Sequence, residues 1–175
     1  MKYFATSDWH FYHRKMLSGE IGVRPPNYET LILQRYRSTV GEDDIVFILG
    51  DLFFQVEKYK AAFASLIRSL PGKKFLVKGN HDKSRLLTND YLTKDCGFEN
   101  VSELCIDFKY PIGESTRTDT RYTKERERLK VAFSLTQSQY NVHGHTHEYA
   151  TQLPCISVSV EQTDYYPYDL GYLLK

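Results

Sequence analysis

The feature that most constrains the fold is an uninterrupted apolar run, Ile45–Leu49, which ends at Gly50-Asp51. A strand with one face in solvent alternates apolar and polar residues, whereas an all-apolar run is typical of a strand buried on both faces. Strands of this kind occur mainly in parallel sheets whose two faces are covered by other layers. The run therefore predicts an interior strand of an α/β protein.

Strand and helix patterns alternate along the first half of the chain, and strand patterns dominate the second half. β-prone segments predict strands at Lys2–Ser7 and Lys73–Lys78, and apolar spacing predicts helices at Tyr28–Val40 and Val56–Leu70. Beyond them we expect helices at Ser84–Leu92 and Thr123–Leu135, a polar loop at Gly113–Tyr122, and strands at Val101–Tyr110, Tyr140–His143, Ile156–Val160 and Leu170–Leu174. This order favours α/β layers over an all-β fold. Because the sequence contains no repeat or linker, residues 1–175 are expected to form a single domain.

Charge and cysteine content exclude several classes of protein. Lys and Arg number 23 against 22 Asp and Glu, so the net charge of +1 gives no general attraction to nucleic acid or membranes. Three scattered cysteines without a Cys-x-x-Cys pair favour neither a disulfide framework nor a thiolate zinc site. The N-terminus has no apolar signal segment, and no stretch approaches the roughly 20 apolar residues that span a bilayer. We therefore expect a soluble, cytoplasmic protein without a membrane partner.

Potential metal ligands follow two of the predicted strands in pairs. Asp8 and His10 come directly after the first strand, and His145 and His147 follow the strand at Tyr140–His143. Side chains at positions i and i+2 of an extended segment lie on the same side, so each pair could bind one ion. Carboxylate and imidazole ligands together suit first-row divalent metals such as manganese, iron, nickel or zinc.

Two further strand ends carry polar residues of the same kind. Asp51 follows the buried strand, where an unpaired carboxylate is costly, and a bridging position between two cations would explain it. Asn80 offers an amide oxygen, and His81 beside it could act as a general acid. Each residue alone also has a structural explanation as a turn former, a helix cap or a packed imidazole. Their gathering at strand ends, where α/β proteins build their sites, favours the functional interpretation.

In their order and spacing these motifs resemble the calcineurin-like metallophosphoesterases, especially the small bacterial and phage-type phosphohydrolases. The motifs are Asp8-Trp9-His10, Gly50-Asp51, Gly79-Asn80-His81-Asp82 and Gly144-His145-Thr146-His147. The similarity also includes Thr6-Ser7, Phe11, His13 and the closing Val158-Ser159-Val160-Glu161, so it covers nearly the whole chain. The resemblance implies a four-layer αββα sandwich, with two sheets flanked by helices.

The resemblance also implies a ligand set and a reaction. One metal would be bound by Asp8, His10, Asp51 and His147, and a second by Asp51, Asn80, His145 and a further histidine. A metal-activated hydroxide would attack phosphorus, while His81 protonates the leaving oxygen and Asp82 orients the His81 ring. Manganese is the expected ion, with iron, nickel or zinc as alternatives.

The further histidine of the family pattern is missing, because no histidine occurs between His81 and His143. Aligning Phe108-Lys109-Tyr110-Pro111 with the family segment puts Lys109 in its place, and a rival alignment that puts Leu135 there leaves little chain before Gly144. An ammonium group does not bind a metal unless it loses its proton. The second metal could therefore bind weakly with water completing its shell, the site could be mononuclear with Lys109 contacting phosphate, or catalysis could be lost.

Substrate and partners are open at the level of sequence. The substrate is a phosphoester, cleaved as a diester or monoester, with nucleotides and nucleic acid among the candidates. His13 could contact substrate phosphate or pack beneath the first loop. The mixed-charge segment 117–130 is read either as a solvated face or as a basic cap that steers substrate. The alternative function is a catalytically silent protein-binding module on the same fold, and a homodimer is compatible with both.

Overall fold

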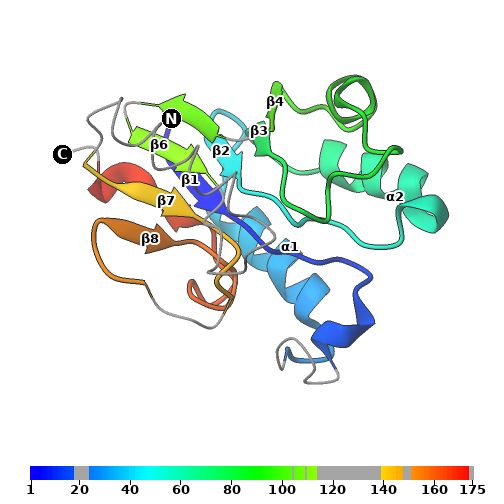
Figure 1. Ribbon diagram of the computed structural model, residues 1–175, viewed down its shortest axis with the longest axis horizontal. Helices are drawn as coiled ribbons and strands as arrows, with labels where there is room; N and C mark the ends of the chain where they lie inside the picture. Colours follow the sequence, from blue (N-terminus) through cyan, green and yellow to red (C-terminus); the bar gives the residue numbers. More distant parts are fainter. Residues whose placement is uncertain (18–23, 104, 109, 114–138, 148–150, 174–175) are drawn as a thin grey trace.

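The computed structural model describes residues 1–17, 24–103, 105–108, 110–113, 139–147 and 151–173, which form two sheets and two long helices (Figure 1). The first sheet has the order β4-β3-β2-β1-β9. Its strands are β1 (Tyr3–Thr6), β2 (Ile45–Ile48), β3 (Lys73–Val77), β4 (Asn100–Ser102) and β9 (Tyr168–Asp169). Strands β1 to β4 are parallel, and β9 pairs antiparallel with β1. The carboxyl ends of β1, β2 and β3 therefore meet at one edge.

The second sheet has the order β5-β6-β7-β8. Its strands are β5 (Cys105–Phe108), β6 (Tyr110–Gly113), β7 (Asn141–His143) and β8 (Cys155–Ser157). Strands β5 and β6 form an antiparallel hairpin, while β6, β7 and β8 are parallel. Beyond the strands proper, Ser7 forms a parallel bridge with Ser159. This bridge joins the two sheets where the first and last ligand motifs begin.

The interior strands of the first sheet are buried on both faces, as the apolar run predicts. Val46 and Ile48 belong to one hydrophobic cluster, and Phe47 and Leu49 belong to a second. The first cluster lies under helices α1 (Tyr28–Thr39) and α2 (Val56–Arg68) and includes Ile32, Tyr36, Phe63 and Ile67. The second cluster lies between the sheets, because it includes Val142 of β7 and packs against Ile156 of β8. Because successive side chains of a strand point to opposite faces of the sheet, the residues of β2 contribute to both hydrophobic clusters.

These layers are an α/β arrangement of helices, sheet and sheet, and the predicted α/β fold class is confirmed. The helix expected at Thr123–Leu135, which would supply the fourth layer of an αββα sandwich, lies outside the described residues. No helix in the part of the chain that the structure describes is long and apolar enough to cross a membrane.

Three of the predicted elements are wrong in place or type. The helix expected at Ser84–Leu92 is a series of turns followed by the π-helical turn η2 (Tyr91–Asp95), because Thr88 Oγ1 accepts the Tyr91 N–H and starts the helical geometry there. The strand expected at Val101–Tyr110 is divided between the two sheets as β4 and β5. The strand expected at Leu170–Leu174 is the 3₁₀ turn η4 (Leu170–Tyr172), which Asp169 caps by accepting the Gly171 N–H.

Candidate metal centre

Five of the six predicted metal ligands adopt a left-handed backbone conformation. Their φ angles are +59° for Asp8, +49° for His10, +52° for Asp51, +70° for His145 and +47° for His147. This region costs a non-glycine residue about 1–3 kcal/mol and persists only where the surrounding structure holds it. The extended geometry expected for the Asp8/His10 and His145/His147 pairs is therefore wrong. The side chains converge because the chain turns sharply after each strand.

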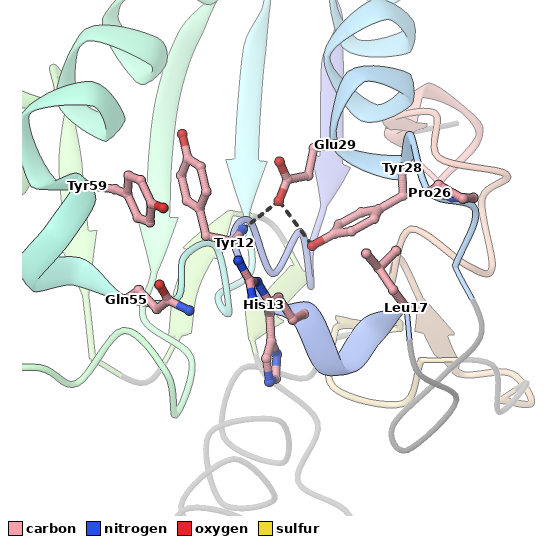
Figure 2. Close-up of a pocket in the computed structure, with 9 residues that line it drawn as sticks. Tyr12, His13, Leu17, Pro26, Tyr28, Glu29, Gln55 and Tyr59 are labelled. Atoms are coloured by element: carbon pink, nitrogen blue, oxygen red, sulfur yellow. Dashed lines mark hydrogen bonds between the residues drawn. The ribbon is translucent and has the colours of Figure 1, made fainter.

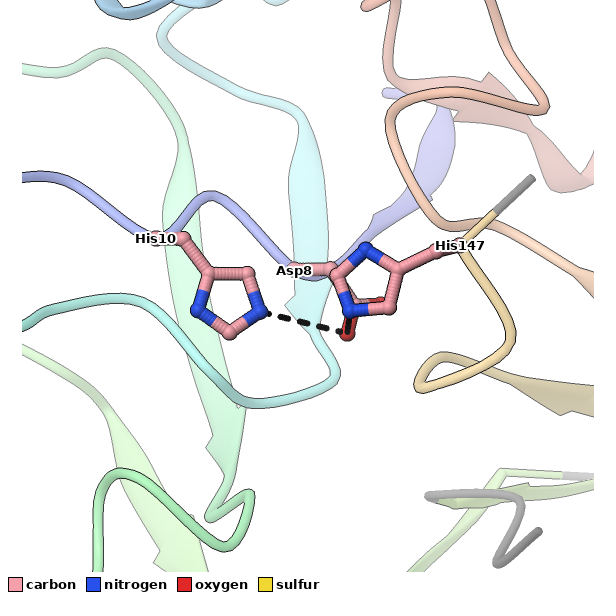
Figure 3. Close-up of side chains that lie close together, drawn as sticks. All are labelled: Asp8, His10 and His147. Carbon is pink, nitrogen blue, oxygen red and sulfur yellow. Dashed lines mark ion pairs between the residues drawn. The ribbon is translucent and has the colours of Figure 1, made fainter. Parts of the chain in front are cut away.

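The two carboxylate oxygens of Asp8 have different partners. Oδ2 accepts hydrogen bonds from Ser7 Oγ at 2.6 Å, Ser159 Oγ at 2.9 Å and the His145 N–H at 2.8 Å. Oδ1 instead lies 3.9 Å from His10 Nε2 and 3.7 Å from His147 Nε2 (Figure 3). Ser7 and Ser159 thus fix the carboxylate so that one oxygen faces two imidazoles.

The two carboxylate oxygens of Asp51 also have different partners. Its Oδ1 accepts the His81 N–H at 2.8 Å. Its Oδ2 lies 4.0 Å from His10 Nε2 and 4.0 Å from His145 Nδ1. One carboxylate oxygen therefore faces an imidazole from each of the two predicted metal sites, which is the position a bridging ligand requires.

The donor atoms fit a divalent cation. Separations of 3.7–4.0 Å are too long for hydrogen bonds, but two atoms that each lie about 2.1 Å from one ion can be up to about 4.2 Å apart. Both ring nitrogens of His10 are buried and have no hydrogen-bond partner among the described residues. Asp8, His10 and His147 offer ligand atoms that all lie within 4.8 Å of one another. A buried imidazole that has no such partner and lies beside two carboxylates fits the donor set of a divalent cation.

Electrostatics support the same interpretation. Burial lowers the pKa of His10 well below its ordinary value, so its ring is neutral, which is the form that binds metals. Burial raises the pKa of Asp8, although His147 works in the opposite direction. Burial would also raise the pKa of Asp51, but the neighbouring His145, His10 and His81 outweigh it and the pKa is lowered. An ion between these groups would offset the cost of burying two carboxylates together.

Close approach of the loops requires glycine, as Gly79 and Gly144 show. A Cβ on Gly79 would lie 2.3 Å from Asp51 Oδ1 and 2.5 Å from the Asp51 backbone nitrogen. A Cβ on Gly144 would lie 2.5 Å from Ser7 Oγ and 2.7 Å from Asp8 Oδ2. Both glycines therefore let one ligand loop pack directly on the carboxylate of another.

The Gly79–Asp82 loop places three more of the predicted site residues beside the cluster. His81 is half-buried, and its ring centre lies 5.2 Å from that of His10. Asn80, also half-buried, precedes it on the same loop. Asp82 is buried, and its carboxylate accepts the N–H groups of Asp51 at 2.7 Å, Gly79 at 3.0 Å and Leu52 at 3.1 Å. These bonds tie the Asp51 loop to the Asn80 loop.

His13 lies at the edge of the centre. It is buried, its ring stacks on Phe54 at 4.0 Å, and its ring centre is 5.3 Å from that of His10. Burial and the nearby His81 lower the pKa of His13 to about 4, so the ring is neutral at physiological pH. Its Nδ1 is buried with no hydrogen-bond partner in the described part of the chain. His13 therefore packs against the ligands, and it offers an unpaired nitrogen close to them.

A cavity of about 240 Å³ borders His13 on the side of the helices (Figure 2). Tyr12 and Tyr59, whose rings stack at 4.0 Å, form one wall, and Tyr28 forms another. Glu29 lies between them, where its Oε1 accepts the Tyr12 N–H and lies 3.3 Å from the Tyr28 hydroxyl. The cavity is therefore largely aromatic, with the Glu29 carboxylate and the Arg14 side chain in its lining, and it adjoins the metal centre through His13.

Two predicted features cannot be placed, because Lys109 and the basic segment 117–130 lie outside the described residues. Several residues that support the centre have no role that the sequence pattern predicts: Ser7, Arg24, Tyr28, Ser159 and Glu161. Ser7, Ser159 and Glu161 lie in segments whose sequence resembles the family, and this resemblance is a signal that could have identified them. Arg24 contacts Glu161, 137 positions away, and no local pattern could indicate that contact.

Comparisons with known proteins give a family match and several relatives. The model of the calcineurin-like phosphoesterase family matches residues 1–149. The Gene 66 protein of Mycobacterium phage D29 is 28% identical over 162 residues, which cover 81% of this chain and 76% of that protein. The Gene 66 protein of Mycobacterium phage L5 is 28% identical over 166 residues, which cover 81% and 75%. The uncharacterized protein MJ1445 of Methanocaldococcus jannaschii is 34% identical over 86 residues, which cover 47% of each chain.

Among solved structures, a protein of unknown function from Aquifex aeolicus, AQ665, superposes with a TM-score of 0.78 at 24% identity. The match covers 98% of this chain and 97% of that one, so the fold is shared along nearly the whole length. The family match covers most of the chain and includes all four ligand motifs. The chain therefore belongs to the calcineurin-like phosphoesterase family, whose members bind divalent metals and act on phosphoesters.

Proposed function

We propose that this chain hydrolyses a phosphoester at the metal centre formed by the four strand-end loops. The observation that carries the proposal is the convergence of Asp8 Oδ1 and Asp51 Oδ2 on His10 Nε2, at 3.9 and 4.0 Å, with both nitrogens of His10 unpaired among the described residues. A buried constellation of this kind is costly without a cation, and membership of the family supplies the reaction class.

In this proposal the first metal ion is bound by Asp8, His10, Asp51 and His147. The second is bound by Asp51, Asn80 and His145. The first ion thus has four protein ligands and the second has three from the described residues, so we expect the first site to bind more tightly. Manganese is the ion we propose, with iron, nickel and zinc as alternatives for a mixed carboxylate and imidazole shell.

Divalent cations at this centre would activate water for attack on phosphorus and neutralise charge on the phosphoryl oxygens. The chain's own residues then have to orient the ester and supply a proton. His81 is half-buried beside the cluster, and its backbone N–H is fixed by Asp51. We assign His81 as the general acid that protonates the leaving oxygen. Asp82 acts through the backbone, because its bonds to the Asp51 and Gly79 N–H groups set the spacing of the two loops.

His13 and the cavity beside it are proposed to contact the substrate. The unpaired, buried Nδ1 of His13 lies next to the ligands and offers a polar contact for phosphate. The organic group of the ester would then lie toward the aromatic cavity lined by Tyr12, Tyr28 and Tyr59. A nucleoside or another planar polar group fits such a lining, because aromatic walls favour stacking and Glu29 accepts hydrogen bonds.

The test is hydrolysis of bis(p-nitrophenyl) phosphate and p-nitrophenyl phosphate by protein stripped of metal and then supplied with Mn²⁺. We expect hydrolysis that requires the metal and falls by about 10³-fold or more in Asp51→Asn, because the bridging carboxylate is lost. The ratio of the two rates separates a diesterase from a monoesterase. Absence of hydrolysis of either ester with manganese, iron, nickel and zinc would contradict the proposal and favour a silent binding module.

A further inference from the structure

Glu161 fixes the orientation of one proposed metal ligand. Its Oε1 lies 3.0 Å from His147 Nδ1. The same oxygen accepts two hydrogen bonds from the guanidinium of Arg24, so the group is a carboxylate. A carboxylate only accepts hydrogen bonds, so the proton of the imidazole lies on Nδ1. The other nitrogen, Nε2, is then directed toward Asp8 Oδ1 at 3.7 Å.

Arg24 holds Glu161 and the first ligand loop together. Its Nε donates to Glu161 Oε1 at 2.8 Å, and its Nη2 donates to the same oxygen. Its Nη1 donates to the Trp9 carbonyl at 2.8 Å, and its Nη2 also donates to the Asp8 carbonyl at 2.7 Å. One guanidinium therefore connects the backbone of the first ligand loop to the carboxylate that orients a ligand on the last loop.

The surroundings make this connection rigid. Arg24 is 3% exposed, and the side chain of Glu161 is 14% exposed, so the ion pair is largely shielded from solvent. The Tyr28 ring lies 5.0 Å from the Arg24 guanidinium, and the Tyr28 hydroxyl donates to the His10 carbonyl at 2.6 Å. The side chains of Arg24 and Tyr28 thus hold the successive backbone carbonyls of Asp8, Trp9 and His10. Because Asp8 and His10 have left-handed backbone conformations, these hydrogen bonds maintain a conformation that the loop would not keep alone.

From these contacts we propose that Arg24 and Glu161 are positioning residues that set the affinity of the first metal site. The inference rests on the proposed function, since it concerns the ion bound by Asp8, His10, Asp51 and His147. Glu161 determines the tautomer and the ring orientation of His147, and Arg24 fixes the position of Glu161 relative to the Asp8 loop. Partners that orient metal-binding histidines typically change metal affinity by 10–100-fold when removed.

The experiment measures Mn²⁺ binding to metal-free protein by calorimetry for the wild type, Glu161→Gln and Arg24→Lys, at a temperature where thermal melts show all three folded. Glutamine keeps the shape and removes the charge, and lysine keeps the charge and removes the fork of donors. We expect the dissociation constant to rise about 10-fold or more in each variant. The loss in the double variant should be smaller than the sum of the two single losses, because both residues help to orient the same histidine.

Asp164→Asn is the matched control. Asp164 is in the same loop as Glu161, pairs with Arg35 at 2.8 Å and is 77% exposed, so the same chemical change there should leave Mn²⁺ affinity unchanged. A residue that only stabilises the fold would lower the melting temperature of the metal-free protein without changing the dissociation constant. If both Glu161→Gln and Arg24→Lys bind Mn²⁺ with wild-type affinity, the inference is overturned and the proposed function is not. A wild type that binds no Mn²⁺ would overturn the proposed function and the inference with it.

Discussion

At the level of single residues, the two oxygens of each carboxylate in the centre make different contacts. Asp8 uses Oδ2 for hydrogen bonds to Ser7, Ser159 and the His145 N–H, and Asp51 uses Oδ1 for the His81 N–H. The remaining oxygen of each residue faces imidazole nitrogens. Hydrogen bonds to one oxygen fix the direction of the other, so the ligands are held in place before the ion arrives.

The role of His81 is tested by changing the leaving group. In His81→Asn we expect the rate to fall about 10²–10⁴-fold for a diester with an alkyl leaving group, because that oxygen departs only when protonated. With bis(p-nitrophenyl) phosphate the fall should be less than about tenfold, because p-nitrophenolate leaves without a proton. Mn²⁺ affinity serves as the control and should not change. Equal losses on both esters would contradict the acid role and assign His81 to substrate binding.

At the scale of elements, four loops approach one another so closely that glycines are required. Parallel β1, β2 and β3 bring their carboxyl ends to one edge. The Ser7–Ser159 bridge places the end of β8 beside them, and β7 pairs with β8. The loops then pack carboxylate against backbone at Gly79 and Gly144. Each loop therefore depends on its neighbour for its conformation, as well as on its own sequence.

Gly79→Ala tests this packing. The added Cβ would lie 2.3 Å from Asp51 Oδ1, so the Asp51 carboxylate has to move. We expect a loss of about 1–3 kcal/mol in the free energy of unfolding and weaker Mn²⁺ binding by about tenfold or more. Gly41→Ala is the control, because a Cβ there meets Asp44 only at 3.4 Å. The measurements are chemical denaturation and calorimetry, and unchanged Mn²⁺ affinity would show that the loop spacing does not set the site.

The sequence predicts the elements that local chemistry determines. Helices α1 and α2 and strands β1, β2 and β3 lie within two residues of the predicted bounds, because amphipathic spacing and apolar runs are local signals. Thr88, which starts a helical turn four residues late, and Asp169, which caps a 3₁₀ turn, act through single hydrogen bonds that periodicity does not reveal. The ligand motifs could be read from the sequence, but the left-handed turns and the Arg24–Glu161 pair depend on tertiary contacts.

At the scale of the whole molecule, the centre connects the two sheets. Asp8, Asp51 and Asn80 follow strands of the first sheet, and His145 and His147 follow β7 of the second. Apart from this edge, the sheets are held by the apolar cluster between them. A metal ion bound here would therefore cross-link segments that lie far apart in the chain.

Metal should accordingly stabilise the whole fold. At 100 times its dissociation constant, Mn²⁺ is expected to add about 2.7 kcal/mol, which raises the melting temperature by about 5–10 °C for a domain of this size. The comparison is between protein treated with chelator and protein with Mn²⁺ added back, followed by circular dichroism. Asp51→Asn should show little of this shift. A melting temperature that does not respond to any divalent ion would contradict the cross-linking role.

The most direct test is to locate the ion. Crystals soaked in Mn²⁺ and measured at the manganese absorption edge should give a strong anomalous peak between Asp8, His10, Asp51 and His147. A weaker peak should lie between Asp51, Asn80 and His145. An anomalous map with no peak among these side chains, or with manganese bound only elsewhere on the molecule, would contradict the account.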